Sequence, residues 1–347
     1  MAIRLGTIFV FSGTILYFLT FNDSFPYLFL TFAFDNKRSQ MMKDNQRPLR
    51  AHLSMFTAEL FWGLMSPLGK DAMTHGIDGI DMVSFRVLGA ALLFWTASLF
   101  TGKVHVPKRD IMLFAGAAVL GIVTNQCLFT IGLSITSPIN ASIVTTSMPI
   151  FAMILSFLIL KEPVTWKKAG GVLIGCMGAV ILILTSASAA NAKVGNIWGD
   201  MMCLLAQLSF ALYLALFNPL VRRYDVITVN KWMFLWASIL ILPFSTGHVM
   251  QIAWSSVPVR TWMETGYVIL FGTFLSYLLS IVGQRTLRPT VVSVYNNVQP
   301  IVAVTISVLA GISIFTFPQG LAIILVFAGV WLVTKSKSKR DMEKGIK

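Results

Sequence analysis

The feature that most constrains this chain is a series of uninterrupted apolar runs, each about 20 residues long. A helix of that length crosses the hydrocarbon layer of a bilayer. Of the 347 residues, 56% are hydrophobic and only 12% are charged, which is about half the charged fraction of an ordinary soluble domain. Because lipid offers no partners to backbone N–H and C=O groups, only helices and closed barrels cross a membrane. The runs lack the alternation of barrel strands, so the sequence predicts an all-α membrane protein.

Ten runs of this kind predict ten transmembrane helices. They lie at about residues 53–73, 80–101, 111–131, 137–160, 167–186, 197–220, 228–246, 264–284, 289–312 and 318–335. Because Lys and Arg are retained on the cytoplasmic side, a correct set of spans makes the connecting segments alternately rich and poor in cations. Here 22 of the 27 Lys and Arg residues fall in one set, and only Lys70, Lys193 and Arg260 fall in the other. We expect a multi-pass protein of a bacterial cytoplasmic (inner) membrane, with both ends of the ten-helix core in the cytoplasm.

The net charge and the cysteines give no indication of a nucleic-acid-binding protein, a disulfide-stabilised protein or a metalloprotein. A formal charge of +13 would suggest nucleic acid for a soluble protein, but these cations sit in short loops, and no nucleic-acid partner is expected. Cys127, Cys176 and Cys203 lie inside apolar runs without paired spacing, so the sequence predicts neither a disulfide framework nor a metal site. We find no phosphate loop or Ser/His/Asp constellation, and expect neither an enzyme nor a cofactor.

Residues 1–52 form an N-terminal extension that fits the span pattern poorly. The run Leu5–Phe21 is long enough to cross the membrane, but Phe25–Phe34 is too short to cross back. Three interpretations stay open: an extra helix with its N-terminus outside, a segment at the membrane surface, or sequence ahead of a true start at Met41 or Met42. The start-site interpretation is favoured among them. No A-x-A-like site follows the apolar run, which disfavours a cleaved signal peptide.

The chain matches itself at one fixed offset, which places Gly132 on Gly283 and Pro149 on Pro300. Twelve identities fall at this offset between positions 121 and 181. Most are Gly, Pro, Ser or Thr, whereas chance similarity between apolar helices would favour Leu, Val and Ile. We therefore predict a first repeat at 53–186 (helices 1–5), a second at 197–335 (helices 6–10) and a basic cytoplasmic tail at 336–347. Since five spans are an odd number, the second copy enters from the opposite side, and the fold class is two inverted five-helix repeats.

Several motifs carry a resemblance to a known family. They are the run Ala58–Gly63, Arg86 followed by Leu88–Ala91, the stretch Ser137–Ser142, the proline-containing fourth span that ends in Lys161–Thr165, and the glycine-rich fifth span. In this order and spacing the chain resembles EamA-type members of the drug/metabolite transporter superfamily from about residue 53 to 335. The resemblance implies a ten-helix exporter or importer of metabolites that hydrolyses no ATP. The chain has Ser313 where the family often repeats the acid of Glu162, which puts in doubt any role that needs both acids.

Two charged side chains lie well inside predicted spans. Glu59 is the only acid there, and burial in lipid favours the protonated form of a carboxyl group, so we predict that it carries a proton or attracts a cationic group of the substrate. The alternative is that Glu59 reaches the headgroups or pairs with a nearby cation. Arg86 lies about two turns from the outer end of the second span, and we expect it to extend outward along its own stem. An anion contact at the mouth of a cavity is the alternative for Arg86.

Polar and aromatic side chains near the middle of the membrane predict a substrate-binding site. Pro149 and Pro300 fall near mid-span, and each frees the carbonyl four residues earlier, so both predict a helix kink. The polar residues before them either satisfy the kinked backbone or contact the substrate, and both roles are compatible. The candidate substrate-binding residues are Trp62, Asn125, Gln126, Asn140, Thr145, Gln207, Tyr213, Tyr277, Tyr295, Asn296, Asn297 and Gln299.

Small residues mark one further face. Gly171, Gly175 and Gly178 allow another helix to approach the fifth span closely. We expect this face to pack within the bundle, and a homodimer contact is the alternative.

Inverted repeats around a polar midplane are typical of proteins that alternate between outward-open and inward-open cavities. The sequence therefore predicts a secondary transporter (permease) for a small organic metabolite, such as an amino acid or an amphipathic compound. Its partners are the solute, the lipid bilayer and a coupling proton. The alternative is a membrane-embedded enzyme or a receptor-like protein without transport.

Overall fold

The computed structural model describes residues 46–102, 104–136, 141, 144–189, 196–302, 305 and 316–337, and every regular element within these ranges is helical. The prediction of an all-α protein is confirmed for this part of the chain. The N-terminal extension up to residue 45, most of the stretch Ser137–Ser142 with its candidate Asn140, and Ser313 lie outside the described residues.

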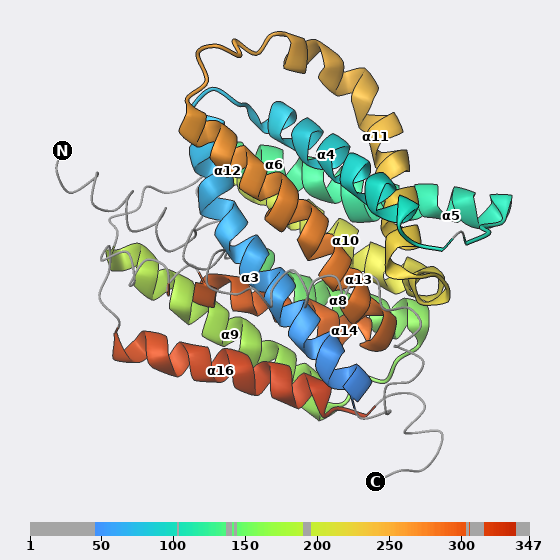
Figure 1. Cartoon of the computed structure of the whole chain (residues 1–347). Coiled ribbons are helices and arrows are strands. Elements are labelled where there is room, and N and C mark those ends of the chain that lie inside the picture. Colours follow the sequence, from blue (N-terminus) through green and yellow to red (C-terminus); the bar gives the residue numbers. More distant parts are fainter. Residues whose placement is uncertain are drawn as a thin grey trace.

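The helices pack side by side in one bundle (Figure 1). In chain order they are α3 (Gln46–Thr74), α4 (Gly79–Leu99), α5 (Lys108–Ala118), η2 (Val119–Thr124), α6 (Asn125–Ile135), α8 (Met148–Leu160), α9 (Trp166–Ala189), α10 (Ile197–Arg223), α11 (Val226–Met250), α12 (Val259–Ile269), η3 (Leu270–Leu275), α13 (Ser276–Thr286), α14 (Pro289–Val294), η4 (Tyr295–Val298) and α16 (Phe317–Thr334). The segments η2 and η3 are π-helical, whereas η4 is a 3₁₀ turn.

Within the described residues, five helices are long and apolar enough to cross a membrane. They are Gly79–Leu99, Lys108–Ile135, Ile197–Arg223, Val226–Met250 and Val259–Thr286. Large apolar side chains are exposed on the outside of the bundle, for example Leu92, Phe244 and Ile324. Water would disfavour such a surface, whereas lipid is a good solvent for it. The chain is an integral membrane protein.

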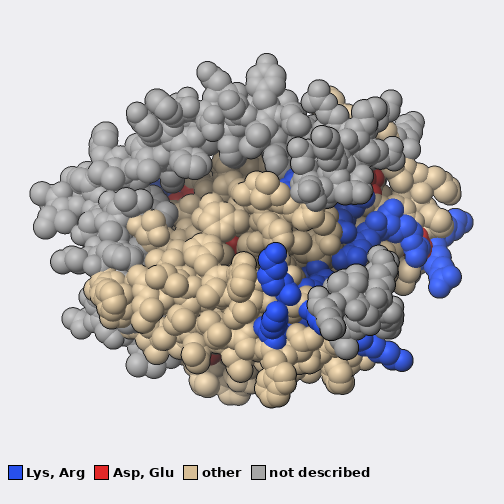
Figure 2. Space-filling model, turned by 90° about the horizontal axis from the view of Figure 1, so that it is seen from below, with Lys and Arg blue, Asp and Glu red and all other residues tan. Residues whose placement is uncertain are grey.

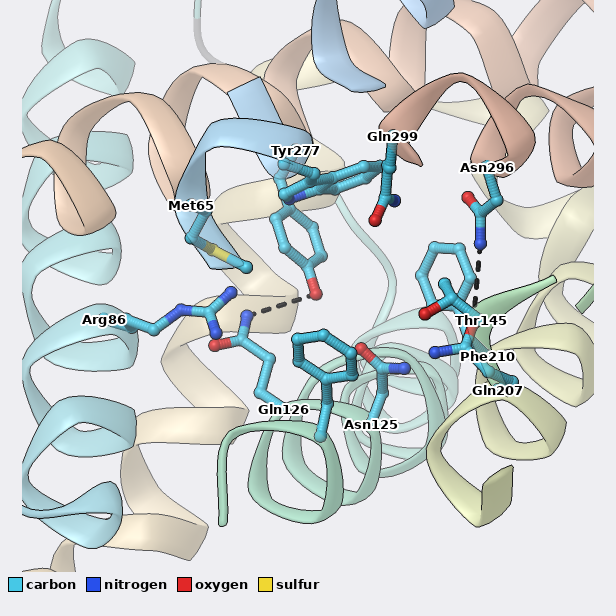
Figure 3. Close-up of a pocket in the computed structure, with 12 residues that line it drawn as sticks. Met65, Arg86, Asn125, Gln126, Thr145, Gln207, Phe210, Tyr277, Asn296 and Gln299 are labelled. Carbon is cyan, nitrogen blue, oxygen red and sulfur yellow. Dashed lines mark hydrogen bonds between the residues drawn. The ribbon is translucent and has the colours of Figure 1, made fainter. Parts of the chain in front are cut away.

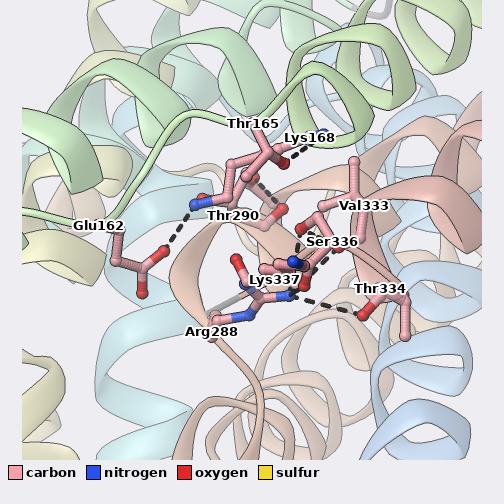
Figure 4. A network of polar contacts seen from close by, with 10 residues as sticks. Glu162, Thr165, Lys168, Arg288, Thr290, Val333, Thr334, Ser336 and Lys337 are labelled. Carbon is pink, nitrogen blue, oxygen red and sulfur yellow. Dashed lines mark hydrogen bonds and ion pairs between the residues drawn. The ribbon is translucent and has the colours of Figure 1, made fainter. Parts of the chain in front are cut away.

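One end of the bundle is rich in cations. There Arg223, at the end of α10, lies 2.8 Å from Asp110 at the start of α5. Arg288, which precedes α14, donates hydrogen bonds to the carbonyls of Ser336 and Lys337, just after α16 (Figure 4). Lys168 pairs with Glu162 nearby, at 2.8 Å. In Figure 2, Lys and Arg gather toward one side of the face, and the described residues on the other side are mostly neither basic nor acidic. We refer to this as the basic end.

Different contacts hold the opposite end. Arg260, at the start of α12, lies 2.7 Å from Asp71 near the end of α3. Lys70 donates to three carbonyls at the C-terminal end of α6, at 2.7 to 3.0 Å, where a cation complements the helix dipole. Thr136, just after α6, donates to Asp200 in the first turn of α10. The continuous helix α5–η2–α6 therefore runs from the basic end to the opposite end, and α10 runs back.

Glycines allow α9 and α16 to lie against each other along their length (Figure 1). A Cβ placed on Gly329 would lie 2.6 Å from the carbonyl oxygen of Gly171 and from the Cα of Gly175. A Cβ on Gly178 would lie 2.7 Å from the carbonyl oxygen of Ala322. The small-residue face expected on this helix is occupied by a contact within the chain.

Several helix boundaries recur at the offset of the sequence repeat. The three segments α5, η2 and α6 have the same lengths as α12, η3 and α13, and each begins at the position that the offset assigns to its counterpart. The starts of α3 and α10 and the starts of α9 and α16 are related in the same way. Regular α-helix is also interrupted just before Pro149, where α8 begins, and before Pro300, by η4.

We expect Gly329→Ala to destabilise the protein by about 1–3 kcal/mol, because the added methyl group would force α9 and α16 apart. The matched control is Gly170→Ala, since a Cβ at Gly170 meets nothing within 4 Å and Ala is the better helix former. Thermal unfolding of the purified protein in detergent would measure both. Equal melting temperatures for the two variants would contradict the proposed role of this close contact.

Candidate functional site

A cavity lies in the interior of the bundle, and twelve residues line it (Figure 3). They are Trp62 and Met65 of α3, Arg86 of α4, Asn125, Gln126 and Phe129 of α6, Thr145 before α8, Gln207 and Phe210 of α10, Tyr277 of α13, Asn296 of η4, and Gln299. The empty space is about 500 Å³ when its open mouth is included. Residues from both the N-terminal and the C-terminal half of the chain thus share one cavity.

The polar residues are distributed unevenly around the cavity. Arg86 lies at one end of the view in Figure 3, whereas Gln207, Asn296 and Thr145 lie at the other. The side chain of Asn296 donates to Gln207 Oε1 over 3.5 Å. Tyr277 lies between the two ends. We call the end at Arg86, where Gln126 also lies, the cationic end; the end formed by Gln207, Asn296 and Thr145 is the amide-rich end, and the part around Tyr277 is the aromatic middle.

Aromatic side chains of the wall pair with backbone carbonyls of the two π segments. Tyr277 donates its hydroxyl hydrogen to the carbonyl of Gly121 in η2 at 3.2 Å and accepts a hydrogen bond from Gln126 at 3.1 Å. The indole N–H of Trp62 donates to the carbonyl of Gly272 in η3 at 2.9 Å. The rings of Trp62 and Tyr277 meet edge to face, with centroids 5.7 Å apart. These bonds stabilise the irregular backbone and fix the orientation of both rings.

Eight of the twelve residues predicted to bind substrate line this cavity. They are Trp62, Asn125, Gln126, Thr145, Gln207, Tyr277, Asn296 and Gln299. Besides Trp62 and Tyr277, two more of them bond to backbone carbonyls: Asn125 donates to Ala206 at 2.9 Å, and Thr145 donates to Ala141 at 2.6 Å. The second bond reaches back four residues, as expected for a hydroxyl that satisfies a carbonyl beside a helix break.

Three predicted residues lie outside the cavity wall. Tyr213 donates its hydroxyl hydrogen to Gln284 at 2.9 Å, and its ring packs where a side chain on Gly121 would have to be. Tyr295 bonds to His52 at 2.7 Å. Asn297 lies against Gly175 of α9. Side-chain direction around a helix separates these three from their neighbours in the wall.

Glu59 lies behind the wall of the cavity. Its side chain is fully buried, and Oε2 accepts a hydrogen bond of 2.7 Å from the amide of Gln299, which does line the cavity. Its Oε1 is buried without a hydrogen-bond partner, and no Lys, Arg or His among the described residues forms an ion pair with it. The alternative that Glu59 reaches the headgroups or pairs with a cation is therefore wrong for the described part of the chain.

The expectation that Arg86 extends outward is wrong. Its side chain is only 4% exposed and lines the cavity. Its depth in the membrane follows from the sequence but its direction does not, because that depends on which face α4 turns toward α6 and η3. The hydroxyls of Thr130 and Thr273 provide the polar partners that make an inward direction possible.

Met65, Phe129 and Phe210 also line the cavity and were not predicted. In a membrane protein, apolar side chains face both lipid and cavities, so residue type alone does not show which of them line a cavity. Helical spacing provides a usable signal, since each follows a predicted polar or aromatic wall residue by three positions and so shares its helix face: Trp62 and Met65, Gln126 and Phe129, Gln207 and Phe210.

Comparisons with known proteins identify related chains. The sequence model of the EamA-like transporter family matches residues 49–184 and 197–335. The uncharacterized transporter YyaM of Bacillus subtilis is 25% identical over 77% of this chain and 84% of its own length. The S-adenosylmethionine/S-adenosylhomocysteine transporter of Chlamydia trachomatis is 26% identical over 72% of this chain and 78% of its own. A protein solved by crystallography, 15% identical, shares the fold with a TM-score of 0.65 over 83% of this chain and 98% of its own.

Proposed function

Because the chain belongs to the EamA-like transporter family, we propose that this membrane transporter is a secondary transporter that moves a small organic metabolite by alternating access. The observation that carries this proposal is the interior cavity, whose wall combines polar side chains from both halves of the chain. Buried polar groups are energetically costly in a membrane protein unless they form hydrogen bonds with one another or with a solute. Polar residues that converge on empty space fit a solute-binding site.

We further propose ten spans in two inverted repeats, at 53–186 and 197–335, between an N-terminal extension and a basic cytoplasmic tail. The recurrence of helix boundaries at the offset of the sequence repeat supports this. So does the direction of the helices, because α5–η2–α6 leaves the basic end while its counterpart α12–η3–α13 begins at the opposite end. The gathering of cations at one end favours a cytoplasmic location for that end, in a bacterial inner membrane.

The solute we propose is an amino acid or an amphipathic compound. The amide-rich end of the cavity suits a polar group, and the aromatic middle suits a flat or apolar body. The relatives in Chlamydia trachomatis are named as transporters of S-adenosylmethionine and S-adenosylhomocysteine, two compounds that join an amino-acid group to an aromatic base. That combination fits the same division of the wall.

Two ion pairs provide a physical basis for alternating access. Asp71 and Arg260 join α3 to α12 at one end, and Arg223 and Asp110 join α10 to α5 at the basic end. The helix pairs correspond at the offset of the repeat, with acid and base exchanged. Both pairs are partly exposed, so each is weak enough to break during a transport cycle. We propose that each ion pair holds its own end closed and that they open in turn.

Glu59 is the group we propose for proton coupling. A carboxyl group that exchanges a proton must switch between a charged and a neutral form, and its hydrogen bond to Gln299 links this switch to the cavity wall. Movement of Gln299 on solute binding would change the stability of the charged form.

Uptake of labelled solutes into proteoliposomes tests the proposed function. The full chain is reconstituted and offered amino acids, S-adenosylmethionine, S-adenosylhomocysteine and amphipathic cations, with and without a pH gradient. We expect saturable uptake of at least one solute, and loss of that uptake in Asn125→Trp, because an indole at this wall position would obstruct the cavity. Uptake of every solute at the rate of protein-free liposomes would contradict the proposed substrate class.

Glu59→Gln tests proton coupling. The amide keeps the size of the carboxyl group and a hydrogen-bonding oxygen for Gln299, but it carries no exchangeable charge. We expect the variant to exchange solute for solute across the membrane while losing acceleration by a pH gradient. Glu162→Gln, which changes an acid at the basic end, is the control and should keep that acceleration. The same response to the gradient in Glu59→Gln and the native protein would refute the coupling role.

Asp71→Asn and Asp110→Asn test the two ion pairs. A single reporter thiol is introduced at the cavity wall by Thr145→Cys in a chain without Cys127, Cys176 and Cys203. We expect Asp71→Asn to increase labelling by an impermeant thiol reagent from the face that carries Asp71, and Asp110→Asn to do so from the basic face, each about tenfold if 1.4 kcal/mol of closure is lost.

The matched control for the ion-pair experiment is Glu162→Gln. It breaks the Glu162–Lys168 pair, which lies within the N-terminal half alone, and should alter labelling from neither face. Unchanged labelling in both aspartate variants, or increases from the wrong faces, would exclude the proposed closing role.

A further inference from the structure

Arg86 is held firmly with its guanidinium group at the cavity wall. Its Nε donates to the hydroxyl of Thr273 at 3.0 Å, and Nη1 donates to the hydroxyl of Thr130 at 2.9 Å. These threonines come from η3 and α6, so three segments fix one side chain. A guanidinium group has five N–H donors in a planar arrangement. The two threonines engage two of them, and Figure 3 shows the group directed at the interior beside Gln126 and Met65.

No acidic residue in the described part of the chain pairs with this cation. Both of its hydrogen-bond partners are neutral hydroxyls. Among the described residues, no acidic group lies within ion-pair distance of Arg86, and all the ion pairs found join other residues. Arg86 is also the only charged residue of the twelve that line the cavity. A buried charge without an opposite charge beside it is strongly unfavourable, so binding of an anion next to Arg86 would lower the free energy of the site.

A purely structural role explains the geometry poorly. Two hydroxyl acceptors need only two donors, and a neutral amide side chain supplies two without the cost of burying a charge. The lysines and arginines that stabilise helix ends bond to carbonyls at the two ends of the bundle, as Lys70 and Arg288 do. Arg86 instead lies in the interior and faces empty space.

We propose that Arg86 binds a carboxylate group of the transported solute and thereby selects solutes that carry one. This inference rests on the proposed function of the cavity. The planar guanidinium group matches a carboxylate with two parallel hydrogen bonds. A carboxylate carries one negative charge and neutralises Arg86 fully, whereas a dianionic phosphate would leave a net negative charge in the interior. The amide-rich end, across the aromatic middle, then contacts the other polar group of the solute.

Comparison of free acids with their amides tests the inference without any substitution. The purified full chain in detergent is titrated with L-phenylalanine, L-methionine and L-tryptophan, with the corresponding amino-acid amides and with inorganic phosphate, while its melting temperature is followed. Conversion of the carboxylate to an amide removes the negative charge and keeps the size and planar shape of the group. We expect at least one free acid to bind about tenfold or more tightly than its amide, and phosphate not to stabilise the protein.

Two variants and a control localise the effect. Arg86→Gln should remove the preference for the acid over the amide. Arg86→Lys keeps a cation without the planar arrangement, so it should retain part of the preference for the acid. This variant replaces Arg86→Gln in the test if the glutamine variant does not fold. Lys231→Gln changes a cation that lies over Trp95, away from the cavity, and should bind as the native protein does.

The inference would be overturned by equal binding of acids and amides, by no stabilisation from any of the acids, or by an undiminished acid preference in Arg86→Gln. Stabilisation by phosphate alone would assign the site to a different anion and would also overturn it. Failure of the proposed function gives a separate result, namely acid-selective binding in detergent without uptake of any solute by proteoliposomes. Uptake of amides as fast as acids would instead leave transport intact and refute the role of Arg86.

Discussion

The rest of the structure depends on one constraint, which is that polar groups at membrane depth must find partners inside the protein. Regular helices meet this constraint on their own, but a solute pathway needs polar surface and therefore irregular backbone. In this chain the freed carbonyls lie in the two π segments, and side chains of the cavity wall pair with them. Trp62 bonds to Gly272, and Tyr277 bonds to Gly121. The groups that stabilise the backbone are thus the groups that shape the cavity.

Because the same side chains stabilise the backbone and shape the cavity, the two roles considered for the polar residues, which are pairing with freed carbonyls and contacting the solute, are compatible. Thr145 satisfies a carbonyl next to the break before Pro149 and still lines the cavity. Tyr277 accepts from Gln126 and donates to Gly121, yet its ring forms part of the aromatic middle. A side chain whose hydrogen bonds are already made is held in one orientation, and such preorganisation lowers the entropic cost of binding a solute.

Much of this site was predictable because polar residues are rare inside apolar runs. Asn125, Gln207 and Asn296 stand out in the sequence for that reason, and each lines the cavity. Their neighbours show the limit of this argument. Asn296 and Asn297 are adjacent and chemically identical, but only the first lines the cavity, since direction around the helix depends on a local 3₁₀ turn that no residue pattern announces. The two π segments could not be predicted from the sequence either, because each lies in an apolar run whose composition also suits a regular α-helix. The direction of Arg86 was missed for a related reason: it depends on Thr130 and Thr273, which lie 44 and 187 residues away along the chain.

A chain with matching helix boundaries still builds an asymmetric site. Tyr213 occupies the position that the offset of the repeat assigns to Trp62, yet Trp62 lines the cavity while Tyr213 packs over Gly121 and bonds to Gln284. Arg86 of α4 is the only charged residue of the twelve that line the cavity. A cation therefore occurs on one side of the cavity without a counterpart on the other. In the transport cycle that we propose, similar helices provide a framework that can exchange two conformations, and the differences between the halves would favour one orientation of the solute.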